Sequence, residues 1–429
     1  MTVDAPISQS IDKNNLSDFV YLDHAASTPM RAEAIAAMAP FMSGVYANPS
    51  GSHRFARIAR KAIDEARDDV ADVIGCKVGE VIFTSGGTEG DNATIFGAAR
   101  RKGGIAVCSA AEHHAVLHCV ENLNGRIIGV DATGVIDINA LENALQDPQN
   151  AGRVNVVSVM AVNNEVGSIS PLRQVAKIVR ANAPGAVLHT DAVQATCWQD
   201  LREISKLVDV MSLSAHKFGG PKGMGITMQR IGLEIDPLIV GGGQERDRRS
   251  GTHNVGGIMA TAAALRETDS TRDVEIARVT KLRDALIDVV IAGLDDVLET
   301  VDRDKRVPGI AHLCIAGCES EAILFLLDEA MICASAASAC ASGAMEPSHV
   351  LSAMGIDPKY TMGALRMSLG HTTTERDIDR ASTALIAAVH QLRRNKTAHN
   401  TAHNTAHNTA HNTAHNTAHN TTHKVSASK

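Results

Sequence analysis

Residues 212–225 read SLSAHKFGGPKGMG, and this segment gives the first indication of both the fold and the chemistry. Lys217 follows a short apolar run that ends at Leu213, with Ser214 and His216 beside it and a turn rich in glycine and proline after it. A lysine at the end of a buried strand is rare unless it is paired or chemically used, and desolvation next to another cation prepares it to form a Schiff base. A surface turn with two incidental lysines is the competing interpretation, and both stay open on this segment alone.

The apolar run before Lys217 is one of several that alternate with helical patterns. Several of these runs are continuous rather than alternating, which is typical of strands buried on both faces of a mostly parallel sheet. Helical spacing of apolar residues lies between them, as in residues 172–182. The chain is therefore predicted to be an α/β protein. The predicted strands cover residues 81–83, 105–108, 126–130, 154–162, 186–189 and 208–213.

The flanks of this alternating region carry patterns of their own. Apolar residues recur every three or four positions from Arg54 to Ile74, where Ser52 is the predicted N-cap and Gly75 ends the helix. From about Thr268 the pattern changes, which predicts a smaller C-terminal domain. The elements expected there are a helix over 273–293, a strand over 310–315, and helices over 319–329 and 375–394.

Composition argues against several classes of protein. The 429 residues are 44% hydrophobic and 21% charged with a net charge of −7, which disfavours a basic nucleic-acid-binding protein, and 3% aromatic residues are too few for base-stacking platforms. The sequence contains no run of about 18 uncharged apolar residues, so no membrane span is predicted. The polar start of the chain is unlike a secretory signal. The eight scattered cysteines indicate reduced thiols and a cytoplasmic protein rather than a disulfide scaffold.

The C-terminal segment has the composition of a tail. From Thr397 to Asn420 the sequence Thr-Ala-His-Asn is repeated six times, and a short polar stretch ends at Lys429. Residues 397–429 contain no Leu, Ile, Phe or Met, so they cannot bury enough apolar surface to offset the entropy of ordering, and we expect them to be disordered. Weak metal binding by the histidines and a neutral repeat expansion are the two interpretations, of which the second is favoured.

Polar segments follow the predicted strands, at the edge where open α/β sheets bind ligands. Residues 85–88 form a glycine-rich turn before a helix, which suits a phosphate held by backbone N–H groups but is equally typical of an ordinary β–α turn. Asp191 ends another strand, where it either balances a cation such as a pyridinium nitrogen or caps a helix. Gln194 lies one helical turn further on.

Histidine and cysteine supply two more candidates. His113 and His114 follow the strand over 105–108, and because no cysteine or acid with metal-ligand spacing accompanies them, ring stacking or proton transfer is favoured over metal binding, with helix capping as the alternative. Cys340 lies among small residues at 337–343, where exposure near positive charge makes a thiol nucleophilic and burial makes it inert.

Taken together, these segments resemble the cysteine desulfurases of the NifS/IscS type, which belong to the class V aminotransferases of the pyridoxal-phosphate (PLP) fold type I. The resemblance runs from Tyr21 to about Arg376. It implies an arm over 1–20 that joins the small domain, a large PLP-binding domain over 21–267 with a mostly parallel seven-stranded sheet, and a smaller α+β domain over 268–396. The further motifs that carry it are YLDHAASTP (21–29), NPSGSH (48–53), VNNEVG (162–167), GGGQE (241–245), RSGT (249–252), EPSHVL (346–351) and LRMSLG (365–370).

The resemblance implies how PLP is bound. Lys217 is expected to link covalently to the cofactor, Asp191 to pair with the ring nitrogen and Gln194 to hydrogen-bond the ring hydroxyl. His113 is expected to stack on the ring and to help proton transfer, with Asn164 at the ring edge. The groups expected to hold the phosphate are Thr88, Ser214, His216, the backbone at Gly87 and, from the second subunit of a homodimer, Thr252.

The resemblance also implies a reaction. Arg366 is expected to bind the carboxylate of L-cysteine through a bidentate fork, with Asn164 nearby, and Cys340 to attack the substrate sulfur. The products are L-alanine and a persulfide on Cys340, which passes sulfur to an iron–sulfur scaffold protein or a tRNA-thiolation carrier. A cluster shared transiently with such a scaffold would make Cys340 an iron ligand. Neither direct nucleic-acid binding nor membrane attachment is expected.

Two alternatives remain beside this interpretation. One is another class V enzyme, either a selenocysteine lyase or an aminotransferase that uses no thiol, against which Cys340 argues. The other is a non-catalytic PLP-fold partner in sulfur assembly, against which the joint presence of Lys217, Asp191, His113 and Cys340 argues. The chain departs from the family pattern at Ala337, where Gly is usual, and at His24, where Asn is usual.

Overall fold

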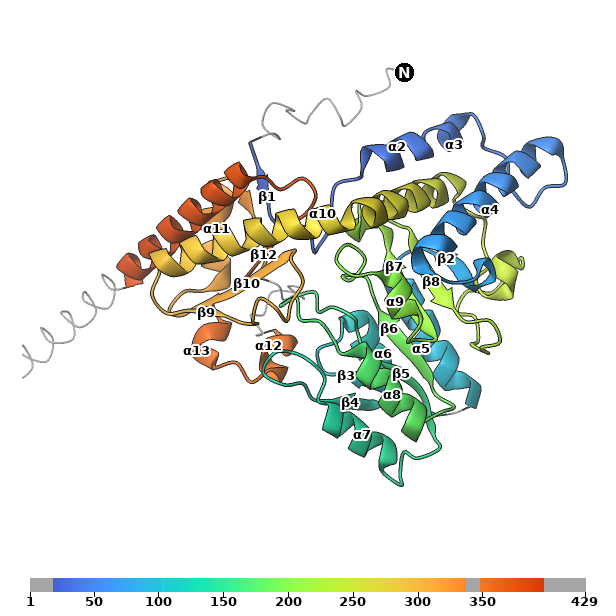
Figure 1. The fold of residues 1–429 in the computed structure, drawn as a ribbon, viewed down its shortest axis with the longest axis horizontal. Helices are drawn as coiled ribbons and strands as arrows, with labels where there is room; N and C mark the ends of the chain where they lie inside the picture. The colour runs from blue at the N-terminus through green and yellow to red at the C-terminus, as the bar shows by residue number, and fades with distance from the viewer. Residues whose placement is uncertain (1–17, 103, 337–347, 397–429) are drawn as a thin grey trace, which may run out of the picture.

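The computed structural model describes residues 18–102, 104–336 and 348–396, which form a larger and a smaller unit bridged by one long helix (Figure 1). The larger unit is built on a seven-stranded sheet with the strand order β2-β8-β7-β6-β5-β3-β4. This confirms the predicted α/β class and the mostly parallel seven-stranded sheet. Within the described ranges, no helix combines the length and the apolar character that a membrane crossing needs.

All neighbouring strands of the large sheet are parallel except β8, which runs antiparallel to both β2 and β7. The sequence analysis did not predict β8, and it extended β5 four residues too far. The strands are β2 (Val81–Thr84), β3 (Ile105–Ser109), β4 (Arg126–Ile128), β5 (Val154–Ser158), β6 (Val187–Asp191), β7 (Val210–Ser214) and β8 (Gly225–Gln229).

Helices bury both faces of this sheet, which explains the continuous apolar runs. Val156 packs in a cluster with α5 (Gly87–Lys102) and α6 (His114–Asn122), whereas its neighbour Val157 packs in the main core on the opposite face. Successive side chains of a strand point to opposite faces, so a strand covered on both sides is apolar at every position. The remaining helices of this unit are α2 (Ala32–Met38), α3 (Pro40–Ser43), α4 (Arg54–Ile74), α7 (Ile138–Gln146), α8 (Leu172–Asn182) and α9 (Leu201–Ser205).

Helix α4 has the predicted bounds, but its N-cap differs from the prediction. The cap is His53, whose ring nitrogen Nδ1 accepts a hydrogen bond from the Ala56 backbone N–H at 3.1 Å. The predicted cap, Ser52, lies one position too early for its hydroxyl to take this role. Gly75 ends the helix in the left-handed conformation with φ of 71°, as glycine does at many helix ends.

The long helix α10 (Val255–Gly293) bridges the two units and begins well before the predicted start at Asp273. Its first half packs against α2 and α4 and includes the buried Gly256 and Gly257, so it lacks the polar face that marks an amphipathic helix. The expected domain boundary at residue 268 therefore falls inside a continuous helix.

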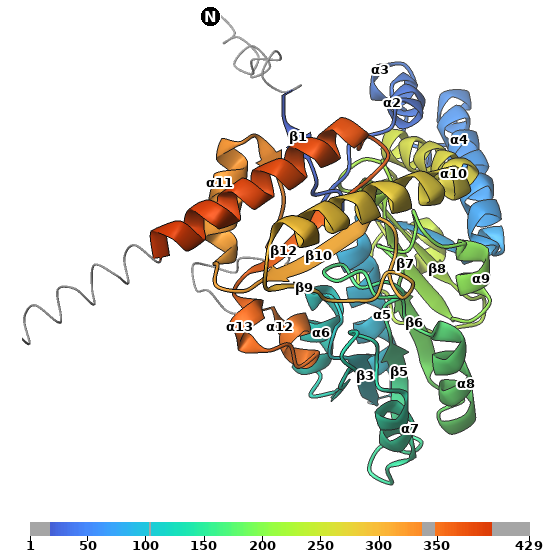
Figure 2. The ribbon, with the colours of Figure 1, turned by 60° about the vertical axis from the view of Figure 1, so that its left-hand side comes forward.

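The smaller unit carries an antiparallel sheet of order β12-β10-β9 beside a short parallel pair of β1 with β11 (Figure 2). The pairing of β1 with β11 brings the start of the described chain against this unit. Its elements are β1 (Val20–Tyr21), β9 (Val297–Glu299), β10 (Ile310–Ile315), β11 (Ile332–Cys333), β12 (Ala364–Ser368), α11 (Ser320–Glu329), α12 (His349–Ala353), α13 (Pro358–Thr361) and a helix over 375–396.

Candidate active site

The carboxyl ends of the parallel strands open into a cavity of about 440 Å³, which is large enough for a cofactor. The cavity collects most of the residues that the sequence analysis selected. Two of the selected residues are not among them: Thr252 is exposed elsewhere on the chain, and Cys340 lies outside the described residues. The selected residues that line the cavity are Gly87, Thr88, His113, Asn164, Asp191, Gln194, Ser214, His216, Lys217 and Arg366.

Lys217 projects into the cavity from a 3₁₀ turn, Ala215–Lys217, directly after β7. Its Nζ donates hydrogen bonds to the carbonyl oxygens of Ala25 at 2.6 Å and Ala26 at 2.7 Å. Burial and then the nearby Arg366 guanidinium lower the pKa of Lys217 to about 8. An amine that loses its proton this readily can form a Schiff base and can accept a proton near neutral pH.

Asp191 ends β6 and is buried at the floor of the cavity. Its Oδ1 accepts a hydrogen bond from the Val193 backbone N–H at 2.8 Å. Burial, and then the negative charge of Asp91, raise the pKa of Asp191 to about 7. The ion pairs found in the described part of the chain do not include Asp191, so a cationic ring nitrogen is the partner that this carboxylate lacks.

Gln194 lies beside Asp191, where its Nε2 donates to the carbonyl oxygen of Ala25 at 2.8 Å. The same carbonyl also accepts from Lys217, so the segment that follows β1 ties both side chains to one point of the cavity wall. The amide of Gln194 therefore has a fixed orientation toward any ring placed between Asp191 and Lys217.

The beginning of helix α5 also lines the cavity, through Gly87 and Thr88. Gly87 is its first residue, so the unpaired backbone N–H groups of the first turn face a ligand at this point. A Cβ atom at position 87 would lie 2.7 Å from Cγ2 of Val193, so a larger residue there would have to displace the Val193 side chain. Ser214 and His216 lie on the same wall, and burial together with Lys217 lowers the pKa of His216 to about 4.

His113 caps a helix and also lines the cavity. It is the N-cap of α6, where its Nδ1 accepts a hydrogen bond from the Ala115 backbone N–H at 3.1 Å. Its ring also lines the cavity, and the surrounding protein together with the charge of Lys217 lowers the pKa of His113 to about 4. The ring is therefore neutral at pH 7 and can lie against an aromatic ligand.

Arg366 reaches the cavity from β12 of the smaller unit. Its Nη1 donates to the Asn164 carbonyl oxygen and its Nη2 to Oδ1 of Asp23, both at 2.8 Å. The backbone of Arg366 pairs with that of Ser335, which also lines the cavity and is the last such residue before the segment that contains Cys340. A fixed guanidinium at the cavity mouth is suited to a substrate carboxylate.

The sequence analysis missed several residues of this site. Asp23 holds Arg366, the carbonyls of Ala25 and Ala26 hold Lys217, and Asp91 lies at the floor. Asp23, Ala25 and Ala26 belong to the motif over residues 21–29, which was noted in the sequence, but the motif did not indicate what these three residues do. Asp91 follows the glycine-rich turn, and nothing in the sequence distinguished it from the acidic residues that commonly occur near the start of a helix.

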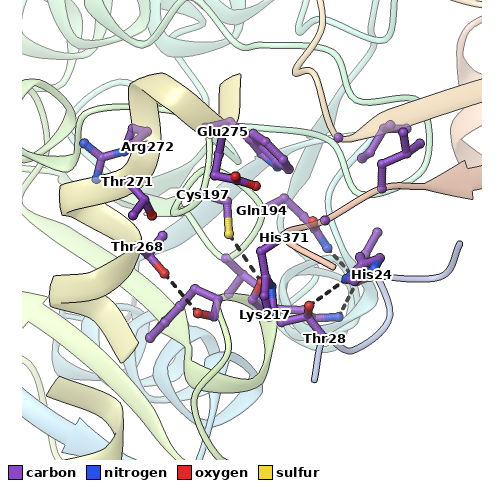
Figure 3. A pocket seen from close by; sticks show the side chains of 18 of the residues that line it. His24, Thr28, Gln194, Cys197, Lys217, Thr268, Thr271, Arg272, Glu275 and His371 are labelled. Carbon is purple, nitrogen blue, oxygen red and sulfur yellow. Dashed lines mark hydrogen bonds between the residues drawn. The ribbon is translucent and has the colours of Figure 1, made fainter. Parts of the chain in front are cut away.

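A second, small cavity of about 40 Å³ lies behind Lys217 (Figure 3). Cys197 lies there, and its thiol donates to the Lys217 carbonyl oxygen at 3.5 Å. His24 is buried on the opposite wall, where its Nδ1 lies 2.6 Å from the Thr28 hydroxyl and burial lowers its pKa to about 3. The uncommon histidine at position 24 therefore fills the wall of this cavity and does not reach into the larger one.

Together, the residues of the larger cavity fit PLP. A phosphate matches the N–H groups at Gly87, an aldehyde matches the amine of Lys217, and a protonated ring nitrogen matches the buried carboxylate of Asp191.

Comparisons with known proteins agree with this fit. The family model for class V aminotransferases matches residues 20–381. The chain is 41% identical over 382 residues to "Cysteine desulfurase IscS" of Dictyoglomus turgidum, covering 87% of this chain and 95% of that protein. It is 42% identical over 387 residues to "IscS-like cysteine desulfurase" of Mycobacterium tuberculosis, covering 87% and 97%.

Solved structures give the same result. A "NifS-like protein" superposes with a TM-score of 0.79 at 32% identity, covering 86% of this chain and 99% of that chain. "SspA in complex with cysteine" superposes with a TM-score of 0.71 at 28% identity, covering 81% and 98%.

Proposed function

The chain belongs to the class V aminotransferase family, and from this premise we propose that it is a PLP-dependent cysteine desulfurase. As a sulfurtransferase, it removes sulfur from L-cysteine and leaves L-alanine. The observation that carries the proposal is the convergence of the Lys217 amine, the Asp191 carboxylate and the start of α5 on one cavity, in a chain about two-fifths identical to proteins named cysteine desulfurases.

The cavity residues divide the work of holding PLP. Lys217 forms the covalent link, Asp191 pairs with the ring nitrogen, Gln194 hydrogen-bonds the ring hydroxyl and His113 lies against the ring face. When bound, PLP draws electrons from the α-carbon of an attached amino acid and makes the α-proton acidic. The phosphate is held by Gly87, Thr88, Ser214 and His216, with Thr252 contributed by the partner subunit of a homodimer.

The protein's own groups then carry out the sulfur transfer. Arg366 and Asn164 orient the substrate carboxylate, and the neutral amine of Lys217 accepts the α-proton. The thiolate of Cys340 attacks the substrate sulfur, so that an S–S bond forms while the C–S bond of the substrate breaks. His113 takes part in the proton transfers that complete L-alanine, and Cys340 is left as a persulfide.

The position of Cys340 in the chain supports this role. Ser335 lines the cavity, and Cys340 follows it by five residues. Because an extended chain spans about 3.3–3.6 Å per residue, this connection can reach about 17 Å, which is enough to bring the thiol over the cavity.

The acceptor is inferred to be an iron–sulfur scaffold protein or a tRNA-thiolation carrier in the cytoplasm. The relatives named IscS support the first. During delivery to a scaffold, Cys340 becomes a transient ligand of iron that belongs to the cargo. Thr252 supports the homodimer, because it is exposed on its own chain and does not line its own cavity.

Two variants test the proposal. Cys340→Ser is expected to keep the visible absorption band of bound PLP and to lose sulfide release from L-cysteine, because the sulfur has no acceptor thiol. Lys217→Ala is expected to lose the covalent link, measured by reduction with borohydride and peptide mapping. Undiminished sulfide release by Cys340→Ser contradicts the proposal. Retained release of selenium from selenocysteine, or transfer of the amino group to a keto acid, would instead identify one of the two other class V activities.

A further inference from the structure

Three carboxyl groups are buried around the floor of the cavity: Asp91, Glu112 and Asp191 are 1%, 0% and 5% exposed. The proposed function uses only Asp191. In the part of the chain that the structure describes, Oδ1 of Asp91 and Oε2 of Glu112 have no hydrogen-bond partner. Buried carboxyl oxygens without partners are costly, and they concentrate where a site handles charge.

Asp91 lines the same cavity as Asp191, and its negative charge acts on Asp191. It belongs to α5. Helix α5 approaches the sheet closely at Gly90, where a Cβ atom would lie 2.8 Å from the Ser212 Oγ. The Ser212 hydroxyl hydrogen-bonds the Asp91 carboxyl group, and Ser212 is the register partner of Asp191 between β6 and β7. Asp91 is thereby held against the part of the sheet that carries Asp191.

His189 completes this layer without neutralising it. It precedes Asp191 by two residues in β6, so both side chains are on the same face of the sheet. Its Nδ1 lies 2.8 Å from the Ser158 hydroxyl, and its Nε2 lies 3.0 Å from the Ser212 hydroxyl and 3.4 Å from Oδ1 of Asp91. Burial lowers the pKa of His189 to about 4, so the ring is neutral at pH 7.

The other titratable groups around Asp91 and Asp191 do not cancel the repulsion between these two carboxyl groups. Lys217 faces Asp191 from the cavity side and is the cation of the group. Glu112 lies before α6, and burial raises its pKa well above the usual value. Cys119 on α6 faces Asp91, and burial raises the pKa of its thiol to about 11. Near neutral pH, charge on Asp91 therefore makes charge on Asp191 less favourable.

We propose that Asp91 is a positioning residue for the cofactor ring. It acts through Asp191, because it sets the pH range in which the Asp191 carboxylate is charged and able to bind a ring cation. The inference rests on the proposed role of Asp191. Burial raises the pKa of both aspartates to about 7 in the cofactor-free protein. A bound cation lowers the pKa of Asp191. Ligand affinity therefore rises as the pH passes the pKa that Asp191 has in the cofactor-free protein, and it levels off above that pH.

The test uses pyridoxine 5′-phosphate, which keeps the ring nitrogen and the phosphate but has no aldehyde for Lys217 to trap. Its dissociation constant is measured by titration calorimetry on the full-length, cofactor-stripped protein from about pH 5.5 to about pH 8.5. The wild type is expected to show a rise in affinity centred near pH 7. Asp91→Asn is expected to move this midpoint down by about one pH unit, because a neighbouring like charge is removed.

Glu112→Gln is the matched control, since it makes the same change from carboxyl to amide beside the same cavity. Burial raises the pKa of Glu112 well above its usual value, and Glu112 does not line the cavity, so the midpoint of Glu112→Gln is expected to stay at the wild-type value. Equal midpoints for the wild type and Asp91→Asn overturn the inference, and so does an equal shift in Glu112→Gln.

A second variant keeps the test decisive if Asp91→Asn does not fold. Ser212→Ala removes the hydrogen bond that favours the charged form of Asp91, so Asp91 stays neutral to higher pH and repels Asp191 less. The midpoint is expected to move in the same direction by a smaller amount, and an unchanged midpoint overturns the inference. A wild-type protein that binds no pyridoxine 5′-phosphate at any pH overturns the proposed function, and this inference with it.

Discussion

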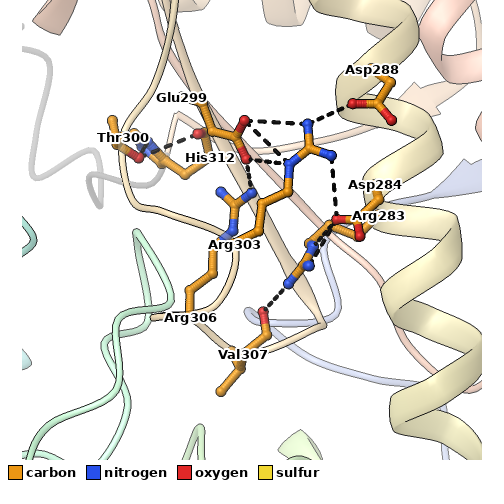
Figure 4. Close-up of polar contacts among 9 residues, drawn as sticks. All are labelled: Arg283, Asp284, Asp288, Glu299, Thr300, Arg303, Arg306, Val307 and His312. Carbon is orange, nitrogen blue, oxygen red and sulfur yellow. Dashed lines mark hydrogen bonds and ion pairs between the residues drawn. The ribbon is translucent and has the colours of Figure 1, made fainter.

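Two buried clusters of charged side chains in this molecule balance their charges in opposite ways. In the smaller unit, the arginine cluster around Glu299 pairs each guanidinium with a carboxylate (Figure 4). Arg306 is fully buried and contacts Glu299, Arg303 lies 3.0 Å from the same carboxylate, and Arg283 lies 2.8 Å from Asp284. Each arginine of this cluster therefore has a carboxylate partner, although Arg283 and Arg303 also act as like charges on Arg306.

The cavity floor is the opposite case, because burial and the negative charge of Asp91 raise the pKa of Asp191, which Lys217 lowers only in part. The desolvation of a buried charge is offset only by a well-placed partner of opposite charge. The arginine cluster already contains such partners. The cavity floor obtains one when a ligand brings a positive charge to Asp191. The comparison indicates that a buried charge without a partner of opposite charge points to a binding site, whereas a buried charge with such a partner does not.

Removing the shared carboxylate of the arginine cluster is expected to have the largest effect. Glu299→Gln leaves the buried guanidinium of Arg306 without its partner, and breaking such a pair costs about 3–5 kcal/mol. The free energy of unfolding is measured by urea denaturation, with PLP binding as a check on the cavity. A loss below about 1 kcal/mol would show that the cluster does not depend on charge balance.

The same kind of substitution at the cavity floor is expected to act in the opposite direction. The pKa of Asp191 in the folded, cofactor-free protein is raised from 3.8 to about 7, so this group's contribution to stability is complete below about pH 4 and is lost as the pH rises through 7. Asp191→Asn removes this loss. At pH 8 the cofactor-free variant is expected to be more stable than the wild type, by at most about 4 kcal/mol.

The measurement is urea denaturation of cofactor-stripped wild type and Asp191→Asn at about pH 8 and about pH 5. The stability advantage of the variant is expected to shrink at the lower pH, while its affinity for PLP is weaker than that of the wild type at both. A variant that is less stable than the wild type at pH 8 would mean that Asp191 already has its partner within the chain.

The fold could be predicted where one segment carries its own pattern. Helices α4 and α8 and strand β10 have the predicted bounds, because an amphipathic stripe marks each helix and a run that is apolar except at His312 marks the strand. The first half of α10 was missed, because it is buried between α2 and α4 and has no polar face. Strand β8 was missed because it follows directly on the glycine-rich turn after Lys217.

The candidate site divides in the same way. Lys217, Asp191 and His113 could be selected because each lies at or just after the end of a strand and belongs to a recognisable motif. Asp91 could not be, since an acid near the start of a helix is favoured by the helix dipole and needs no other explanation. Its burial comes from Gly90, which lets α5 press against the sheet, and this depends on packing that no short segment encodes.

The outer edge of the arginine cluster is expected to give the smallest effect and to complete the comparison. Asp288 lies 2.7 Å from Arg303, but the side chain of Asp288 is 66% exposed, so water and salt already screen the pair. Asp288→Asn is expected to lower the free energy of unfolding by about 0.2–1 kcal/mol, less again at high salt. Urea denaturation beside Glu299→Gln compares an exposed partner of Arg303 with the less exposed partner that Arg303 shares with Arg306. Equal losses from the two substitutions would show that burial does not set the strength of these pairs.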